Sequence, residues 1–282
     1  MKIGVMVESF RVGLAGGLKA AAELGADGVQ IYATSGETHP ANLTGPKRAE
    51  LRRQISGLGL EVSALCADFG GHGFQVAAEN KERIEVSKRV VELALDLGAR
   101  VVTTHIGVVP ADRSNRRYGI LARACEQLGE FAAGAGAVFA IETGPEPSDV
   151  LRAFLEDLGV PRGLGVNLDP ANLAMVIRED AVQAVQNLAP YLSHTHAKDG
   201  INVKPVDAER LYGAPGAAPL DGTWGDFIKE VPLGEGSVNF DTYIPALRQA
   251  GYDGYLTIER EVGETPIEDI RKAVEFLKAK LA

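Results

Sequence analysis

The stretches RVVTTHI (100–106), LARACEQLGEFAAGAG (121–136) and AVFAIE (137–142) place an amphipathic segment between two apolar runs. The two runs have the length of strands, and their continuous apolar character is typical of strands buried on both faces. The segment between them has apolar residues at spacings of three and four and ends in Gly136, a residue that favours the end of a helix. This region therefore predicts a strand, a helix and a second strand parallel to the first.

The same pattern recurs along the whole chain. The apolar runs of strand length are KIGVMV (2–7), GVQIY (28–32), EVSALC (61–66), RVVTTHI (100–106), AVFAIE (137–142), GLGVNLD (163–169), LSHTHA (192–197) and GYLTIE (254–259). Eight strand–helix units joined by short turns predict an α/β protein built as a single (β/α)8 TIM barrel. The sequence contains no linker or low-complexity segment, so we expect one domain over residues 1–282.

One region departs from this rhythm. Residues 199–236 are rich in Gly and Pro and are longer than a usual strand–helix turn. They predict an extended loop on the rim of the barrel, which is either a functional lid or partner surface or a disordered insertion. Trp224, Phe227 and Val231 favour the ordered alternative, because we expect these apolar side chains to be buried. Trp224 is also a candidate for substrate binding.

The composition excludes several classes of partner. The 29 Lys and Arg residues against 38 Asp and Glu give a net charge of −9, whereas duplex binding draws on clustered basic residues, so we expect no nucleic acid partner. A small phosphorylated substrate remains compatible with this charge. The two cysteines make no disulfide framework, and no signal peptide or membrane span is apparent. We therefore expect a soluble, cytoplasmic protein without a membrane partner.

Four acidic or imidazole residues lie at or near the ends of successive apolar runs: Glu142, Asp169, His196 and Glu259. The carboxyl ends of TIM-barrel strands share one rim, where active sites form. One nitrogen and three oxygen ligands predict a site for one divalent cation per chain, Mn²⁺, Mg²⁺ or Co²⁺, and zinc is also compatible. An ion pair or hydrogen bond is the simpler interpretation of any one of these residues, but four at matching positions favour a metal site.

Two neighbours of His196 are further candidates. His194 lies on the same face of its strand but farther from the rim, so we expect it to orient a metal ligand. Lys198 either binds a substrate oxygen or forms an ion pair with Asp199 or Glu142.

The first half of the barrel adds polar residues to the same rim, and a substrate with several hydroxyl groups would need such donors and acceptors. The candidates are Glu8, Gln30, Tyr32, Asp68, His72 and His105. His72 could equally be a solvated residue of a turn, and His105 could equally be a hydrogen-bonded histidine of the core.

Five segments carry a resemblance to a known family. IETGPEP, VNLDPANLAM, SHTHAKDG, PLGEGSVNF and GYDGYLTIERE resemble the xylose isomerase-like superfamily of sugar isomerases and epimerases, which includes ketose 3-epimerases, hydroxypyruvate isomerases and inosose dehydratases. The resemblance implies a metal site at Glu142, Asp169, His196 and Glu259. It also implies that the two glutamates are an acid–base pair on opposite faces of a sugar, and that the protein is a dimer or tetramer.

Two positions depart from the pattern of the ketose 3-epimerases. Asn172 stands where those enzymes carry a histidine three positions after the metal aspartate, and AKDG stands where they carry an arginine after the metal histidine. We expect Asn172 to keep a hydrogen bond to substrate and Lys198 to supply the cation. The HxKD form is more similar to the dehydratase and general isomerase members.

These observations predict a metal-dependent sugar isomerase or epimerase whose substrate is a small sugar or keto-sugar. Glu142 and Glu259 would transfer a proton alpha to a carbonyl through a metal-bound enediolate. One alternative is a metal-dependent dehydratase or lyase acting on a keto-sugar or keto-inositol. An endonuclease IV-like metallonuclease would need more metal-binding histidines than five, together with a basic groove. A non-catalytic sugar-binding or assembly subunit would not require two opposed carboxylates.

Overall fold

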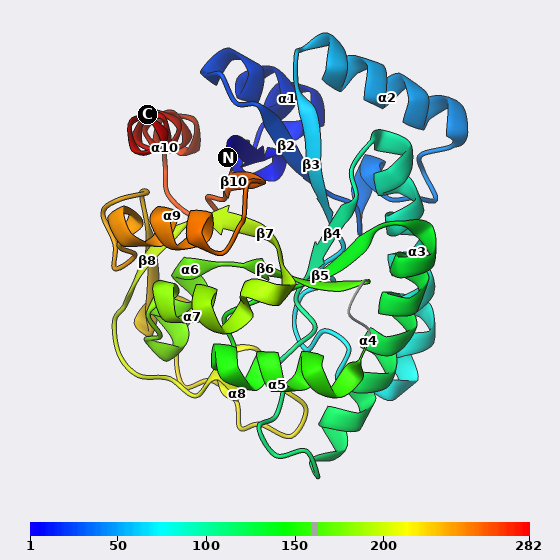
Figure 1. Cartoon of the computed structure of the whole chain (residues 1–282), viewed down its shortest axis with the longest axis vertical. Helices are drawn as coiled ribbons and strands as arrows, with labels where there is room; N and C mark the ends of the chain where they lie inside the picture. The colour runs from blue at the N-terminus through cyan, green and yellow to red at the C-terminus, as the bar shows by residue number, and fades with distance from the viewer. Residues whose placement is uncertain (160–162) are drawn as a thin grey trace.

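The computed structural model describes residues 1–159 and 163–282. Eight parallel strands close into a barrel in the order β1-β10-β7-β6-β5-β4-β3-β2, and helices surround it as an outer layer (Figure 1). This arrangement confirms the predicted (β/α)8 TIM barrel. The barrel strands are β1 (Lys2–Met6), β2 (Gly28–Tyr32), β3 (Glu61–Cys66), β4 (Val101–Thr104), β5 (Val138–Glu142), β6 (Leu164–Leu168), β7 (Leu192–Ala197) and β10 (Tyr255–Ile258).

The helices connect successive strands. They are α1 (Gly13–Leu24), α2 (Gly45–Gly57), α3 (Ala77–Leu97), α4 (Arg116–Ala135), α5 (Ser148–Leu158), α6 (Pro170–Asn172), α7 (Ala181–Leu188), α8 (Ala208–Leu211), α9 (Phe240–Gln249) and α10 (Pro266–Leu281). Short helical turns are η1 (Val7–Phe10), η2 (Gly36–Thr38), η3 (Leu173–Ile177), η4 (Ala189–Tyr191) and η5 (Trp224–Asp226). Helix α4 ends at Gly136 with φ of 75°, a left-handed conformation that glycine adopts at low cost.

Alternation along β7 decides which of its side chains face the inside of the barrel. Thr195 points outward, because its hydroxyl lies 2.6 Å from the hydroxyl of Tyr243 in helix α9. His194 and His196 therefore point to the opposite face, into the barrel. Burial of Phe139 and Ile141 on β5 follows the same rule and leaves Glu142 on the inner face. The alternation of side chains along β7 and β5 thus places the imidazoles of His194 and His196 and the carboxylate of Glu142 inside the barrel.

Strand β4 ends earlier than its apolar run predicts. The run continues to Ile106, but the last residue of β4 is Thr104. The carbonyl of Ile106 accepts a hydrogen bond from the N–H of Phe74. At this position the chain after β4 is therefore bonded to the loop that follows β3, and not to a barrel strand. As a result His105 lies just beyond the strand, at the rim.

The segment 199–236 contains regular structure of its own. Its strand β8 (Asp199–Asn202) pairs antiparallel with β9 (Ile228–Val231), and Figure 1 shows this pair outside the barrel, close to α6. Phe227 and Val231 are buried as expected. The expectation for Trp224 was wrong, because 49% of this residue remains exposed; the turn η5 holds it at the edge of a pocket instead of in the core.

In the part of the chain that the structure describes, no helix combines the length and the apolar character required to cross a lipid bilayer.

Candidate active site

The four residues Glu142, Asp169, His196 and Glu259, here called the ligand cluster, come from four neighbouring strands of the barrel. Glu142 is the last residue of β5, His196 lies in β7, and Asp169 and Glu259 follow β6 and β10. All four are buried. Each offers one nitrogen or oxygen atom, and these atoms lie within 4.8 Å of one another. Strand order therefore brings together residues that are up to 117 positions apart in the chain.

The cluster has the donor chemistry of a divalent cation site. His196 Nδ1 lies 3.3 Å from Asp169 Oδ2, 3.3 Å from Glu259 Oε2 and 3.6 Å from Glu142 Oε1. Three carboxylates around one imidazole concentrate negative charge in a buried space, which is costly unless a cation balances it. One imidazole nitrogen and several carboxylate oxygens form a donor set that binds Mn²⁺, Mg²⁺ or a similar ion. The residues present fit such a group.

The electrostatics of the cluster reflect this crowding. Burial disfavours a charged imidazole, but the carboxylates of Glu259 and Glu142 raise the pKa of His196 well above its ordinary value. Burial also opposes ionisation of Glu142, whereas the imidazoles of His105 and His196 lower the pKa of this carboxyl well below its ordinary value. The two imidazoles thus stabilise the ionised form of Glu142, the form in which a carboxyl group binds metal.

The second ring nitrogen of His196, Nε2, contacts polar side chains on the side away from the three carboxylates. Its Nε2 lies 3.1 Å from Gln30 Oε1, and the amide of Gln30 donates in turn to the hydroxyl of Thr103 at 2.8 Å. The Gln30 oxygen can only accept, so in a neutral, metal-binding imidazole this contact favours the hydrogen on Nε2 and leaves the lone pair on Nδ1, the nitrogen that faces the cluster. Gln30 was expected at the rim, but it lies fully buried beneath it.

His194 lies one layer below the cluster. Its Nδ1 bonds Asn167 Oδ1 at 3.0 Å and its Nε2 accepts from the hydroxyl of Thr257 at 3.0 Å. The amide nitrogen of Asn167 donates to Glu142 Oε2 at 3.0 Å. Burial, followed by the charge of His196, lowers the pKa of His194 to about 3, so it is neutral. It therefore contacts a ligand residue through Asn167, a connection that the sequence analysis did not identify.

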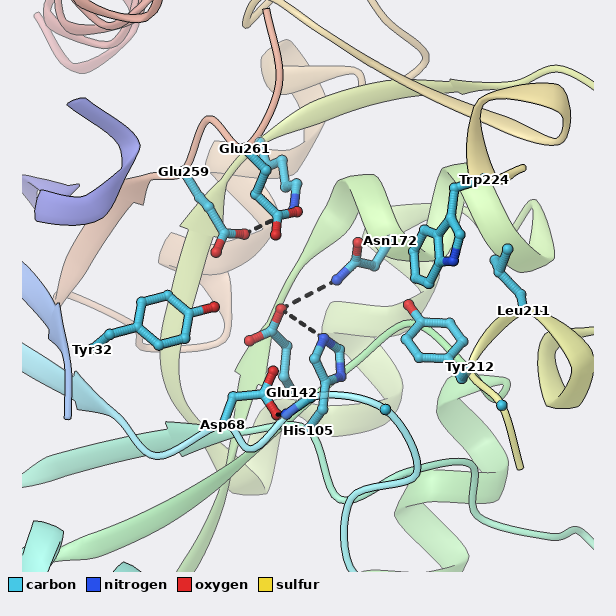
Figure 2. Close-up of a pocket in the computed structure, with 14 residues that line it drawn as sticks. Tyr32, Asp68, His105, Glu142, Asn172, Leu211, Tyr212, Trp224, Glu259 and Glu261 are labelled. Atoms are coloured by element: carbon cyan, nitrogen blue, oxygen red, sulfur yellow. Dashed lines mark hydrogen bonds and ion pairs between the residues drawn. The ribbon is translucent and has the colours of Figure 1, made fainter. Parts of the chain in front are cut away.

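A pocket of about 430 Å³ opens above the cluster. Figure 2 shows Glu142, His105 and Asp68 at its base, Tyr32 and Glu259 on one side, and Asn172, Tyr212 and Trp224 on the other. The predicted substrate-binding residues that line this pocket are Tyr32, Asp68, His105, Asn172, Lys198 and Trp224. It also includes Leu211, Tyr212 and Glu261.

His105 and Asn172 both contact the same carboxylate. His105 Nε2 lies 3.3 Å from Glu142 Oε1, and the amide of Asn172 donates to that oxygen at 3.2 Å. Burial opposes a charge on His105, but Glu142 outweighs it and raises the pKa of this imidazole to about 10. These two residues therefore fix the carboxylate of Glu142 from the side that faces Tyr212.

Lys198 forms neither of the two ion pairs considered from sequence. Its ammonium group bonds Glu259 Oε2 at 2.9 Å, contacts Glu261, and lies 3.7 Å from Glu230 Oε2. Asp199 instead accepts hydrogen bonds from backbone N–H groups. The alternation along β7 and β8 directs Lys198 and Asp199 to opposite sides, so they do not pair. Lys198 holds Glu259 as His105 and Asn172 hold Glu142.

Besides Gln30, two predicted residues, His72 and Glu8, are not brought into this pocket. His72 turns away from it, and its Nε2 lies 3.0 Å from a carboxylate oxygen of Glu79. Glu8 is exposed and lines an adjacent hollow that shares Tyr32 and Glu259 with the pocket.

The sequence analysis missed several residues of the site. Asn167 is the polar residue inside the otherwise apolar strand LGVNL, and this departure from the pattern is a signal that could have found it. Glu261 follows Glu259 by two positions and faces the same side. Leu211 and Tyr212 lie in the irregular segment and carry no comparable signal.

The comparisons with known proteins agree with this architecture. A family model described as xylose isomerase-like TIM barrel matches residues 18–280. The chain is 24% identical over 273 residues to L-ribulose-5-phosphate 3-epimerase UlaE of Escherichia coli strain K12, an alignment that covers 94% of this chain and 89% of that protein. It is 28% identical over 212 residues to the uncharacterized protein MJ1311 of Methanocaldococcus jannaschii, covering 71% of this chain and 63% of that protein, which is less than two thirds of its length.

The fold is shared with a solved structure, the xylose isomerase domain protein from Planctomyces limnophilus. The two chains are 28% identical, and the TM-score is 0.80 over 99% of this chain and 96% of that one. Because the family model spans most of its length, the chain belongs to the xylose isomerase-like TIM barrel family.

Proposed function

We propose that this protein is a divalent-metal-dependent sugar isomerase or epimerase that transfers a proton alpha to a carbonyl group. The observation that carries the proposal is the ligand cluster at the base of a pocket at the carboxyl end of the barrel. A cation held by Glu142, Asp169, His196 and Glu259 would act as a Lewis acid that stabilises negative charge on substrate oxygens. The relative UlaE, named as a sugar-phosphate epimerase, supports the same reaction class.

Glu142 and Glu259 would move the proton. Both carboxylates face the pocket from different strands (Figure 2), so a sugar bound between them would present a carbon to each. One carboxylate would remove the α-proton, leaving an enediolate, and either could return a proton. Return by the same carboxylate to the neighbouring carbon gives isomerisation, and return by the opposite one inverts the centre.

The fixed surroundings of the two carboxylates support these roles. Glu142 is held by hydrogen bonds from Asn167 and Asn172, and Glu259 by Lys198. Holding a base in place before the substrate arrives lowers the entropic cost of proton transfer. Loss of a β-hydroxyl after the same first step would give dehydration, so the products distinguish the dehydratase alternative from epimerisation.

Solvent deuterium exchange tests this proposal. We expect wild-type protein with Mn²⁺ in D₂O to incorporate deuterium next to the carbonyl of at least one ketose in a panel of D-fructose, D-tagatose, D-psicose and L-ribulose, followed by NMR. Glu142→Gln and Glu259→Gln should each reduce the rate by at least about a hundredfold, the usual contribution of a positioned acid or base.

The matched control is Glu130→Gln, which makes the same chemical change on the exposed face of α4 and should leave the exchange rate unchanged. Circular dichroism verifies that all three variants fold. Exchange at the wild-type rate in a folded Glu142 or Glu259 variant would show that this residue is not the base.

A further inference from the structure

One side of the pocket is an aromatic wall formed by Tyr212 and Trp224. The ring of Tyr212 lies 5.6 Å from that of His105, and the ring of Trp224 lies 5.5 Å beyond it. His105 contacts Glu142, so the row of rings leads from the ligand cluster outward to Trp224 (Figure 2). A group that contacts Trp224 therefore lies beyond Tyr212 in this row, and not beside the His105 imidazole that contacts Glu142.

Trp224 is held at the pocket edge in a partly exposed state. The turn η5 that carries it is closed by a capping box, in which Asp226 accepts hydrogen bonds from the N–H and hydroxyl of Thr223. Despite this fixed position, 49% of Trp224 is exposed. An exposed indole beside a pocket is an apolar surface available to a ligand. The C–H face of a sugar ring is such a ligand group, since it is apolar while its edge carries the hydroxyls.

The charges of the pocket disfavour an anionic substrate group. Among the described residues, the lining includes four carboxylates, Asp68, Glu142, Glu259 and Glu261, and no arginine; its cationic side chains are Lys198 and His105, and His105 already pairs with Glu142. Lys198 is already bound by Glu259 and Glu261. A phosphate dianion would therefore meet several carboxylates here, and the cationic side chains of the lining are already paired with them.

Two arginines of the adjacent hollow, Arg11 and Arg260, are also engaged. Arg11 donates to the carbonyls of Gly263 and Glu261, and Arg260 pairs with Glu230 and Asp269. The N–H of Gly70, which also lines the pocket, donates to the carboxylate of Asp68. Lys198, Arg11 and Arg260, the basic side chains at this mouth and the adjacent hollow, are therefore not free to bind a phosphate group.

We propose that the substrate is an uncharged ketose that carries a second ring or a similar apolar-faced group, which packs against Tyr212 and Trp224. The inference rests on the proposed function, because it assumes that the reacting sugar lies over the ligand cluster. It separates this chain from its relative UlaE, whose name specifies a phosphorylated substrate.

The test compares three ligands that share one ketose: D-fructose, D-fructose 6-phosphate and isomaltulose, in which a glucosyl group takes the place of the phosphate. Trp224 is the single tryptophan of the chain, so the intrinsic indole fluorescence of the Mn²⁺-loaded protein reports on this wall alone. We expect isomaltulose to shift this emission and to bind about threefold to tenfold more tightly than D-fructose, the range that aromatic packing provides. D-Fructose 6-phosphate should bind more weakly than D-fructose.

Variants of Trp224 test whether its indole causes the tighter binding of isomaltulose. In calorimetric titrations, Trp224→Ala should bring the ratio of isomaltulose to D-fructose affinity close to one, whereas Trp224→Phe should retain most of it. Leu58→Ala shortens another exposed apolar residue, at the end of α2, and should leave the ratio unchanged.

Tighter binding of D-fructose 6-phosphate than of isomaltulose, or an indole emission that isomaltulose does not move, would overturn the inference. Deuterium exchange decides the proposed function separately. If deuterium exchanged into a ketose but isomaltulose bound no more tightly than D-fructose, the inference about the second ring would be wrong and the proposed isomerase or epimerase function would remain supported. If isomaltulose bound more tightly than D-fructose but no ketose exchanged deuterium, the aromatic binding site would be supported and the proposed proton-transfer function would be wrong.

Discussion

At the scale of single residues, the two nitrogens of His196 have different tasks. Nδ1 faces the three carboxylates of the ligand cluster, and Nε2 faces Gln30. The amide of Gln30 is itself fixed by Thr103, so the orientation of the imidazole depends on a residue from the opposite half of the barrel. A histidine that binds metal depends on such a partner for its tautomer and its direction.

We therefore predict that Gln30→Met weakens metal binding. Methionine has a similar volume but accepts hydrogen bonds poorly, so Nδ1 would no longer be held as the unprotonated nitrogen. The dissociation constant for Mn²⁺, measured by competition with a chromogenic chelator, should rise by about tenfold to a hundredfold. Gln30→Glu keeps an acceptor oxygen and should lose less affinity.

Gln54→Met makes the same change on the exposed face of α2 and serves as the control. A Mn²⁺ affinity in Gln30→Met equal to that of this control would mean that the Gln30 contact does not orient the ligand.

At the scale of elements, Asp199 holds the segment 199–236 together. Its carboxylate accepts four backbone hydrogen bonds, from Gly200 and Val238 to one oxygen and from Gly234 and Gly236 to the other, at 2.8 to 3.0 Å. This ties the start of β8 to the chain that leaves β9. Since Glu230 of β9 pairs with Arg260 just after β10, the same contacts connect the segment to the rim of the site.

We predict that Asp199→Ala loosens this segment. Three of the four amides lie on the chain after β9 and would lose their partner, each at a cost of about 1–3 kcal/mol where water cannot replace it. Amide hydrogen exchange followed by mass spectrometry should show lost protection over residues 228–238, while the barrel strands stay protected. Asp199→Asn retains one acceptor oxygen and should lose about half as much.

Asp207→Ala removes a carboxylate that caps α8 through a single hydrogen bond, to the N–H of Glu209, and it should leave residues 228–238 protected. If Asp199→Ala exchanged no faster there than Asp207→Ala, the carboxylate would not be what holds the segment.

At the scale of the whole molecule, the stability of the barrel should depend on the protonation of Glu146. This residue is buried, and one of its oxygens accepts from the N–H of Val109 at 3.1 Å. Burial raises the pKa of Glu146 from 4.5 to about 8, so the folded protein holds the neutral acid at pH 7. Unfolding exposes the carboxyl to water, where it ionises near its ordinary value.

The sign of the pH dependence follows. The contribution of Glu146 to stability is fully present below about pH 4.5 and is lost as pH rises through about 8, because the unfolded chain releases the proton first. The side chain of Glu146→Gln cannot ionise, so this variant does not lose that contribution. Between these two pH limits, the free energy of unfolding of wild type, measured in urea, should fall relative to that of Glu146→Gln by on the order of 4 kcal/mol. Measurements at pH 5, 6, 7 and 8 suffice to show the divergence.

Glu130→Gln makes the same change on the exposed surface of α4, and its free energy of unfolding should vary with pH as that of wild type does. Parallel behaviour of Glu146→Gln as well would mean that the buried carboxyl does not titrate with a raised pKa.

Local sequence pattern determined the strands, their order in the chain and the four residues of the ligand cluster. Each of these depends on short-range periodicity: an apolar run predicts a buried strand, and a polar residue at its end lies at the rim. Glu142, Asp169, His196 and Glu259 therefore gather as the strand ends predict. The exposed Trp224 and the inward Asn167 show where the pattern gives less information, because a loop has no period and a single polar residue in a strand has several explanations.

Tertiary structure alone decided which polar groups pair with which. Lys198 bonds Glu259 and Glu261 rather than its neighbour Asp199, His72 turns to Glu79, and His196 receives its support from Gln30, 166 positions away. A hydrogen bond or ion pair depends on distances of a few ångströms between side chains. Those distances are set by barrel closure and by the path of each loop in space, and neither is encoded in the spacing of residues along the chain.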